Sequence, residues 1–243
     1  MISVLIPTIQ YDHLPNLING LMREIASVGG ELIVSNNGAK TATNQLLSKY
    51  YCTIINNVRP RSFAESNNDM ARIAKHDKLL LLNDDTAVEV GFIKKMIDTF
   101  QLHPKIGVVG CRIQYMSTGS IQHAGVFFTK EGLPYELRYT VTKHPDADRT
   151  HEVPAVTGAC MMVDKTVWRE LNGLDEAFVN GWEDNDFVLR AKERGYKVWY
   201  NGSAGIRHVL HGSEKYGRML KEDANVALYR KRWIETGRVF KLI

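Results

Sequence analysis

Leu79 to Thr86 reads LLLLNDDT, an apolar run followed directly by polar residues. Four consecutive leucines are typical of a strand that is buried on both faces of a sheet. Asn83, Asp84 and Asp85 then place two adjacent carboxylates where that strand ends. Ligands bind at the carboxyl ends of strands in open α/β sheets, and a divalent cation bound to a phosphate would explain paired carboxylates there. A solvated turn is the competing interpretation, since Asn and Asp are common turn formers.

Short apolar segments and helical patterns alternate on both sides of this stretch. The expected strands are 2–6, 31–34, 52–55, 79–82 and 106–113, and the expected helices are 13–25, 41–50, 63–75 and 90–102. This alternation is typical of a parallel sheet covered by helices. The connections after the strands are rich in Asn, Arg and Asp, which are donors and acceptors suited to a nucleotide. We therefore predict an α/β fold with its ligand site at the carboxyl edge of the sheet.

The pattern of the sequence changes after Tyr115. We expect a strand at 122–129, a long polar loop at 130–149, an apolar segment at 153–163, edge strands at 197–200 and 206–209, and helices at 165–171, 183–195 and 213–237. No repeat, low-complexity segment or linker separates this half from the first. The sequence therefore predicts a single domain over residues 1–243 with one continuous core.

The composition is that of an ordinary globular protein, with 44% hydrophobic and 24% charged residues. A net charge of +4 is too mild to predict a nucleic-acid partner, although it would not repel a phosphorylated ligand. Cys52, Cys111 and Cys160 are far apart and read as reduced thiols. No apolar run is long enough to span a bilayer, and no basic region precedes the first apolar segment. We therefore expect a cytoplasmic protein.

A second informative stretch runs from Asn180 to Gly195 and reads NGWEDNDFVLRAKERG. Glu183, Asp184 and Asp186 fall in the first turn of a predicted helix, where the exposed N–H groups and the macrodipole stabilise negative charge. A carboxylate that stays ionised on a rigid element meets the requirement for a general base. Plain helix capping is the competing interpretation. Trp182, directly before the acidic turn, favours the wall of a binding site.

His208 ends an apparent strand, 24 positions after Asp184. A neutral imidazole is a good ligand for a transition-metal ion, and Asp85 alone cannot fill a coordination sphere. Most single histidines are not ligands, and His211 is a nearby competitor. His123 is expected to be structural or to face an acceptor.

These residues belong to motifs that resemble family-two glycosyltransferases of the GT-A fold, close to the bacterial rhamnosyltransferase-like members. The resemblance covers nearly the whole chain, and each of its motifs is weak alone. In order, the motifs are Ser3 to Thr8 (SVLIPT), Ile33 to Gly38 (IVSNNG), Phe63 to Asn68 (FAESNN), Leu81 to Thr86 (LLNDDT), Ile121 to Gly125 (IQHAG), Thr157 to Ala159 (TGA) and Gly181 to Asp186 (GWEDND).

The resemblance implies a single Rossmann-like mixed sheet flanked by helices, with a nucleotide-sugar-binding half (1–115) and an acceptor-side half (116–243). It implies metal binding by Asp85, Asp84 and His208, and catalysis by Asp184 as the base. Glu183 is implied to contact the acceptor or to serve as the base in place of Asp184. The donor-binding residues that it implies are Pro7, Thr8, Asn36, Asn37, Asn68, Asn83 and Asp84. Asn36 and Asn83 depart from the family, which has Asp at the first of these positions and begins its Asp-x-Asp motif at the second.

The function implied is inverting, metal-dependent transfer of a sugar from a nucleotide diphosphate to a hydroxyl group. The expected cofactor is Mn²⁺ or Mg²⁺, the donor is UDP- or dTDP-linked, and the acceptor is a glycan or a lipid-linked glycan. The alternatives are a nucleotidyltransferase that makes sugar nucleotides and a non-catalytic nucleotide- or carbohydrate-binding module. The basic residues after Ser213, among them Lys215, Arg218, Lys221 and Arg232, read either as a solvated helix face or as a peripheral contact with the inner face of a membrane.

Overall fold

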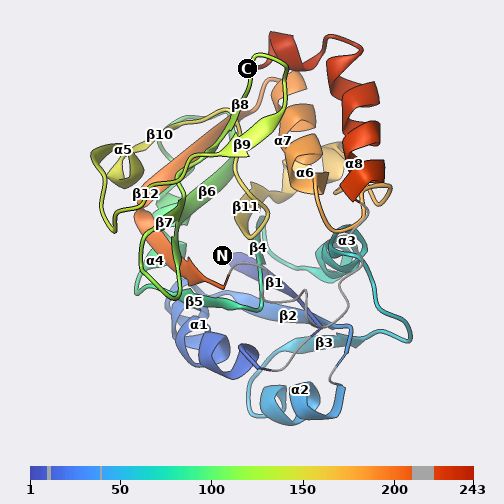
Figure 1. The fold of residues 1–243 in the computed structure, drawn as a ribbon. Coiled ribbons are helices and arrows are strands. Elements are labelled where there is room, and N and C mark those ends of the chain that lie inside the picture. The colour runs from blue at the N-terminus through green and yellow to red at the C-terminus, as the bar shows by residue number, and fades with distance from the viewer. Residues whose placement is uncertain (10–11, 39, 210–221) are drawn as a thin grey trace.

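The computed structural model describes residues 1–9, 12–38, 40–209 and 222–243. These residues form a ten-stranded mixed sheet in the order β10-β12-β6-β11-β4-β1-β2-β3, with β5 paired to β12 and β7 to β6 (Figure 1). The strands are β1 (Ile2–Thr8), β2 (Glu31–Asn36), β3 (Thr53–Asn56), β4 (Lys78–Leu82), β5 (Thr86–Val88), β6 (Ile106–Tyr115), β7 (Ile121–His123), β10 (Thr150–Glu152), β11 (Cys160–Asp164) and β12 (Lys197–His208). A separate hairpin pairs β8 (Val126–Phe128) with β9 (Pro134–Glu136).

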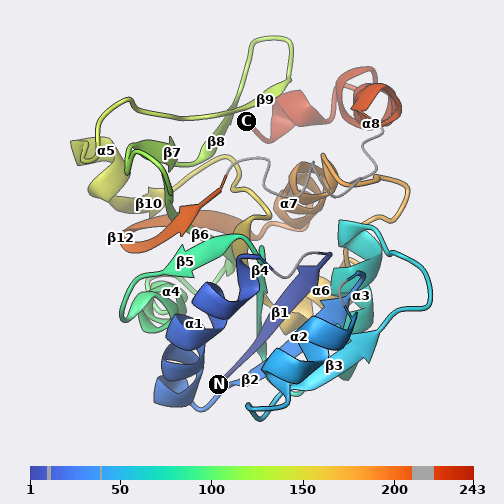
Figure 2. The same cartoon turned by 60° about the horizontal axis from the view of Figure 1, so that its bottom comes forward.

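Helices cover both faces of the sheet (Figure 2). They are α1 (Leu14–Val28), α2 (Lys40–Leu47), α3 (Phe63–Ile73), α4 (Phe92–Thr99), α5 (Pro145–Asp148), α6 (Lys165–Glu170), α7 (Glu183–Glu193) and α8 (Glu222–Tyr229). Leu80 and Leu82 of β4 pack in the core that α1, α2 and α4 share, whereas Leu79 and Leu81 pack in the core under α3, α6 and α7. Because successive side chains of a strand point to opposite faces, all four leucines are buried, as the apolar run predicts.

The mixed α/β sheet predicted from the sequence is confirmed. Strands β3, β2, β1 and β4 are parallel neighbours, as the alternation of strands and helices indicates. The next strand in the sheet is not β6 but β11, which runs antiparallel to both β4 and β6. The apolar segment 153–163 thus contributes the strand that joins the two halves.

The prediction of two edge strands at 197–200 and 206–209 is wrong. Both belong to β12, which lies between β10 and β6 inside the sheet. The intervening sequence, with Gly202 and Gly205, reads as a turn, but the ladder with β6 only shifts its register between Asn201 and Gly205. The Asn201 side chain accepts hydrogen bonds from the N–H groups of Ser203 and Ala204. The segment is therefore a bulge within one strand.

Two other segments of the second half differ from expectation. The strand expected at 122–129 is divided into β7 and β8 at Ala124 and Gly125, and Gly125 has a φ of +107° that favours glycine. The expected loop at 130–149 contains β9 and the one-turn helix α5. Short polar strands such as β9 lack the apolar run that marks a strand in sequence.

The C-terminal helix is expected at 213–237, and the first part of this range lies outside the described residues. His211, Lys215, Arg218 and Lys221 also lie outside them. Within the described residues, α8 continues into a π-helical turn, Arg230–Ile234. Tyr229 and Trp233 pack with Phe178 and Leu189 in a third apolar cluster that attaches this helix to α7. In the part of the chain that the structure describes, none of the helices has the length and apolar character needed to span a bilayer.

Candidate active site

The carboxyl ends of β4 and β12 bring together residues that are far apart in the sequence. Thr86 of β5 pairs with His208 of β12, and the N–H of Val209 donates to the carbonyl of Asp85 at 3.1 Å. As a result, Asp85 Oδ1 lies 3.0 Å from His208 Nε2. Both side chains are buried, with 4% and 7% of their surface exposed.

The Asp85–His208 pair fits a divalent cation. Two neighbouring ligands of an octahedral ion at about 2.1 Å lie about 3 Å apart, which matches the separation of these two atoms. Asp85 Oδ1 is buried and has no hydrogen-bond partner among the described residues, which is costly for a carboxylate unless another positive group compensates. Within the described chain no group of three His, Cys, Asp or Glu side chains is placed to hold an ion. Phosphate oxygens and water would therefore complete the coordination of an ion held by this pair.

Asp84, the carboxylate directly before Asp85 in the sequence, contacts a different neighbour. Its Oδ2 accepts a hydrogen bond of 2.6 Å from the Thr8 hydroxyl at the end of β1. The Thr8 carbonyl accepts from the N–H of Asn37, and Asn37 Oδ1 accepts from Asn57 and from the N–H of Arg61. Pro7 and Asn36 lie on the same two strands and pair across them with Ser35 and Thr8. These residues thus form a continuous polar edge beside the carboxylates.

Asp184 stands at the start of α7. Its Oδ2 accepts a hydrogen bond of 2.8 Å from the N–H of Gly158, and its Oδ1 accepts from the N–H of Asn185 at 2.8 Å. Burial raises the pKa of Asp184 above that of an ordinary aspartate, and the negative charge of Glu136 raises it further, whereas the two N–H groups act in the opposite direction. A carboxylate with a raised pKa is a better proton acceptor than an ordinary one.

The backbone before Asp184 is strained. Asn180 and Trp182 have φ angles of +54° and +75°, in the left-handed region that residues with a Cβ rarely adopt. Such conformations persist only where the surroundings fix them. Asn225 of α8 does so, because its amide group donates to the carbonyls of Val179 and Gly181 and accepts from the N–H of Val179.

The Asn225→Ala substitution is expected to lower the free energy of unfolding by roughly 1–3 kcal/mol, because it leaves partly buried backbone groups of the 179–181 segment without their hydrogen bonds to this amide. Urea denaturation followed by far-UV circular dichroism measures this change. Asn185→Ala is the control, since within the described residues the Asn185 amide donates to the adjacent Asp184 and not to a distant segment. Equal losses for the two variants would contradict the assigned role of Asn225.

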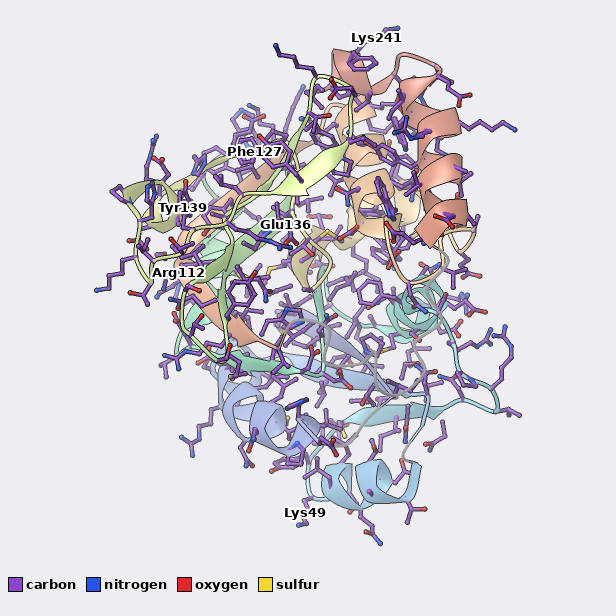
Figure 3. All side chains as sticks on the ribbon, in the orientation of Figure 1. Lys49, Arg112, Phe127, Glu136, Tyr139 and Lys241 are labelled. Carbon is purple, nitrogen blue, oxygen red and sulfur yellow. The ribbon has the colours of Figure 1, made fainter. Side chains whose placement is uncertain are left out.

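A cavity of about 450 Å³ joins these groups. Asn83 and His208 line it on the sheet side, and Asp184 lines it from α7. Glu136, labelled in Figure 3, reaches the cavity from β9. The remaining lining residues include Gln122, Gly158, Trp182, Glu183 and Glu222. The predicted base and one predicted metal ligand thus face the same cavity.

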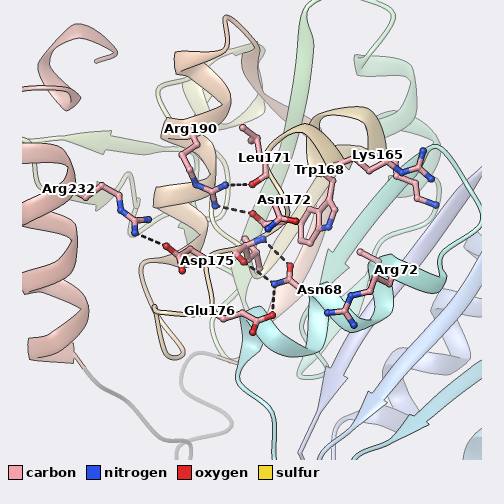
Figure 4. Close-up of a pocket in the computed structure, with 14 residues that line it drawn as sticks. Asn68, Arg72, Lys165, Trp168, Leu171, Asn172, Asp175, Glu176, Arg190 and Arg232 are labelled. Carbon is pink, nitrogen blue, oxygen red and sulfur yellow. Dashed lines mark hydrogen bonds and ion pairs between the residues drawn. The ribbon is translucent and has the colours of Figure 1, made fainter.

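Asn68, a predicted donor-binding residue, does not lie with the others. Its amide donates to the carbonyl of Leu174 and to Glu176, and it accepts from the N–H of Leu174. It lines a second cavity of about 730 Å³ between α3, α6 and α7 (Figure 4). The register of α3 turns Asn68 toward the 174–176 segment, where its amide is engaged, and its contact with the donor stays a prediction.

The arginines of the 56–62 loop are also engaged elsewhere. Arg59 and Arg61 pair with Glu65 at 2.6 and 3.1 Å, and Glu65 in turn forms a capping box with Ser62 at the start of α3. Capping the helix explains the acidic residue at this position. The ion pairs lower the pKa of Glu65 to about 2.

Sequence reasoning did not assign roles to Gln122, Gly158 and Asn225. The Gln122 side chain contacts His208 at 2.7 Å. Gly158 binds Asp184 through its backbone, which any residue type provides, and a Cβ at this position would lie 3.2 Å from both Asp184 and Phe63. The motifs Ile121 to Gly125 and Thr157 to Ala159 contained the signal for the first two. Asn225 belongs to none of the motifs.

Comparison with known families adds to this geometry. The family model described as Glycosyltransferase like family 2 matches residues 2–235. The chain belongs to this family. The resemblance inferred from the motifs is therefore confirmed.

Two curated relatives show how family 2 sequences contain this unit. O-antigen biosynthesis protein RfbC of Myxococcus xanthus is 27% identical over 243 residues, which is 94% of this chain and 19% of that protein. An uncharacterized glycosyltransferase of Haemophilus influenzae is 23% identical over 192 residues, which is 78% of this chain and 61% of that protein. The chain thus spans less than two thirds of the length of either relative.

Solved structures confirm the GT-A fold. GalNAc-T7, crystallised with UDP, GalNAc and Mn²⁺, has a TM-score of 0.71 at 14% identity over 86% of this chain and 43% of that one. The mannosyltransferase PcManGT from Pyrobaculum calidifontis, in complex with GDP-Man and Mn²⁺, has a TM-score of 0.62 at 14% identity over 88% of this chain and 59% of that one. At this level of identity the likeness establishes the fold alone.

Proposed function

We propose that this family 2 protein is an inverting, metal-dependent glycosyltransferase that moves a sugar from a nucleotide diphosphate to a hydroxyl group. The observation that carries the proposal is a cavity lined by both Asp184 and His208, with Asp85 in contact with His208 at its edge. Asp85 and His208 are 3.0 Å apart at the sheet edge. Asp184, on α7, lines the same cavity as His208.

Asp85 Oδ1 and His208 Nε2 are the atoms proposed to hold Mn²⁺ or Mg²⁺, and the imidazole favours Mn²⁺. When bound there, the ion would neutralise the charge that develops on the departing diphosphate. Asp84 is proposed to act on the donor side, because its carboxylate binds Thr8 at the end of β1. Thr8, Asn36, Asn37 and Asn83 are proposed to contact the nucleotide, which is UDP or dTDP.

Asp184 is proposed to take the proton from the attacking acceptor hydroxyl. The O–H bond breaks as the oxygen attacks the anomeric carbon, and the bond to the diphosphate breaks on the other face of the sugar. One displacement assisted by one base inverts the anomeric centre. Glu183 is the weaker candidate for the base, because its Oε2 already accepts a hydrogen bond of 2.6 Å from the N–H of Gly181.

A glycan, free or lipid-linked, is the proposed acceptor, bound beside Trp182 and Glu136 of the cavity wall.

Of the two interpretations of the basic C-terminal residues, the contacts of the described ones favour a helix packed against the protein over a membrane contact. Arg232 pairs with Asp175 and Asp186, and Trp233 is fully buried, so both face the protein interior. Among the described residues of this segment, Arg230 and Lys231 are exposed.

A thermal-shift panel of UDP, dTDP, GDP and their sugar conjugates, each with and without Mn²⁺, tests the proposal. Stabilisation by the true donor should depend on Mn²⁺, since a ligand that binds the native state raises the melting temperature. Asp85→Ala should remove the dependence on Mn²⁺, whereas Asp98→Ala, in an exposed ion pair of α4, should retain it.

Measurement of nucleoside diphosphate release then separates the alternative functions. Slow hydrolysis of the stabilising sugar nucleotide supports a transferase. Synthesis of a sugar nucleotide from a nucleoside triphosphate and a sugar phosphate would identify a nucleotidyltransferase. Binding with no turnover under either condition, even with glycan acceptors, would identify a binding module.

A further inference from the structure

Gln122 of β7 contacts His208 of β12 through a buried hydrogen bond. Both strands pair with Ile113 and Gln114 of β6, so they flank β6 on its two edges, and the two side chains meet across it. Gln122 Oε1 is 2.7 Å from His208 Nδ1, and the two residues have only 3% and 7% of their surface exposed. This contact fixes the orientation of the imidazole ring.

The contact also selects the protonation of the ring. An amide oxygen only accepts hydrogen bonds, so Nδ1 must carry the hydrogen, and the neutral imidazole then has its lone pair on Nε2. On the other side of the ring, the amide nitrogen of Asn83, which only donates, lies 3.3 Å from Nε2. Two amides on opposite sides of His208 therefore favour the same tautomer.

This tautomer directs two acceptors toward each other. The Nε2 lone pair and Asp85 Oδ1 are 3.0 Å apart, and such a pair is repulsive unless a proton or a metal cation lies between the two atoms. The Asn83 amide nitrogen beside Nε2 disfavours a proton there, which leaves the metal cation. Asp85 Oδ1 has no hydrogen-bond donor among the described residues. The amide nitrogen of Gln122 likewise has no partner in the described chain, so the contact with His208 is made by the amide oxygen alone.

We propose that Gln122 is a positioning residue, which holds the His208 ring in the tautomer and orientation that present Nε2 to a divalent cation shared with Asp85. This inference rests on the proposed metal dependence of the enzyme. It also gives a physical role to the glutamine in the Ile121 to Gly125 motif. Partners that orient a metal-binding histidine through its other nitrogen typically change metal affinity by about 10–100-fold when they are removed.

The test is a titration of the full chain with Mn²⁺, in which the electron paramagnetic resonance signal of free Mn²⁺ reports binding. Gln122→Leu, which removes the acceptor, is expected to raise the Kd for Mn²⁺ by about 10–100-fold. Gln122→Glu keeps an acceptor for Nδ1 and is expected to bind Mn²⁺ at least as tightly as the wild type. Far-UV circular dichroism and melting temperatures check that each variant is folded.

Two further variants make every outcome decisive. Gln114→Leu is the matched control, because this half-buried amide on β6 donates to the carbonyls of Gly119 and Thr142, and its Kd should equal that of the wild type. His208→Ala tests the metal site itself. If His208→Ala does not weaken Mn²⁺ binding, the proposed site and this inference both fail. If His208→Ala weakens binding but folded Gln122→Leu has the same Kd for Mn²⁺ as the wild type, the metal site stands and the role of Gln122 is overturned. The same conclusion follows if folded Gln122→Glu binds Mn²⁺ as weakly as Gln122→Leu.

Discussion

Asp184→Asn is expected to lower the rate of sugar transfer by about 10²–10⁴-fold, which is the usual contribution of a general base. An amide cannot take the proton that the acceptor hydroxyl releases, yet it has nearly the same shape as the carboxylate. The hydrogen bond from Gly158 can still be accepted by the amide oxygen. Initial rates of nucleoside diphosphate release, together with the Kd of the donor in the presence of Mn²⁺, measure the effect. The donor Kd should remain close to that of the wild type.

Glu183→Gln provides the comparison for this result. Glu183 accepts from the N–H of Gly181, and its substitution should affect the rate less than Asp184→Asn does. Turnover of Asp184→Asn near the wild-type rate, with loss of turnover in Glu183→Gln, would move the role of base to Glu183. Loss of donor binding in Asp184→Asn would show that Asp184 acts on the donor instead.

The raised pKa of Asp184 predicts the acidic side of the pH–rate profile. As pH falls through this pKa, the carboxylate takes up a proton and the rate falls, so the decline should begin at a higher pH than for an ordinary aspartate. Since the negative charge of Glu136 contributes to the increase, Glu136→Gln should shift the decline to lower pH. A decline that does not move in Glu136→Gln would contradict this coupling.

The Asp186→Ala substitution is expected to cost about 3–5 kcal/mol of folding free energy, because it removes a fully buried carboxylate that two partly buried arginines share. Asp186 is fully buried and accepts from Arg190 at 2.7 Å, from Arg232 at 2.8 Å and from the indole of Trp233 at 3.0 Å. These contacts attach the π-helical turn to α7. Since native domains are stable by about 5–15 kcal/mol, urea denaturation followed by far-UV circular dichroism should detect a large shift.

Glu193→Ala is the control for this prediction. Glu193, the last residue of α7, pairs with Arg238, which follows the π-helical turn, and both side chains are partly exposed. Ion pairs of this kind contribute roughly 0–1 kcal/mol. A similar loss in both variants would indicate that Asp186 acts as an ordinary surface ion pair.

The sequence pattern was sufficient to predict the parallel strands of the first half, and the family resemblance implied the contact between Asp85 and His208. Runs such as Leu79–Leu82 carry their own burial pattern, because a strand covered on both faces must be apolar at every position. The continuity of β12 could not be predicted in the same way. Its middle contains Gly202 and Gly205, which indicate a turn, and only the contact between Asn201 and the following backbone shows that the strand continues.

Contacts between distant segments were the other part that the sequence did not show. Asn225 binds the backbone at Val179, 46 residues earlier, and no local periodicity marks such a contact. The location of Asn68 depends on how α3 is rotated against the 174–176 segment. Placement of β11 between β4 and β6 likewise results from packing of the whole sheet rather than from the alternation of strands and helices.

The insertion of β11 has a consequence for synthesis of the protein on the ribosome. Strands β1 to β4 can pair once residue 82 has emerged, but the free side of β4 has no neighbour until residues 160–164 follow. At about 5–20 residues per second, that interval lasts roughly 4–16 s. During this time the leucine-rich strand is an unprotected edge of the kind that promotes aggregation, so slower translation or truncation before residue 160 should increase the need for chaperones.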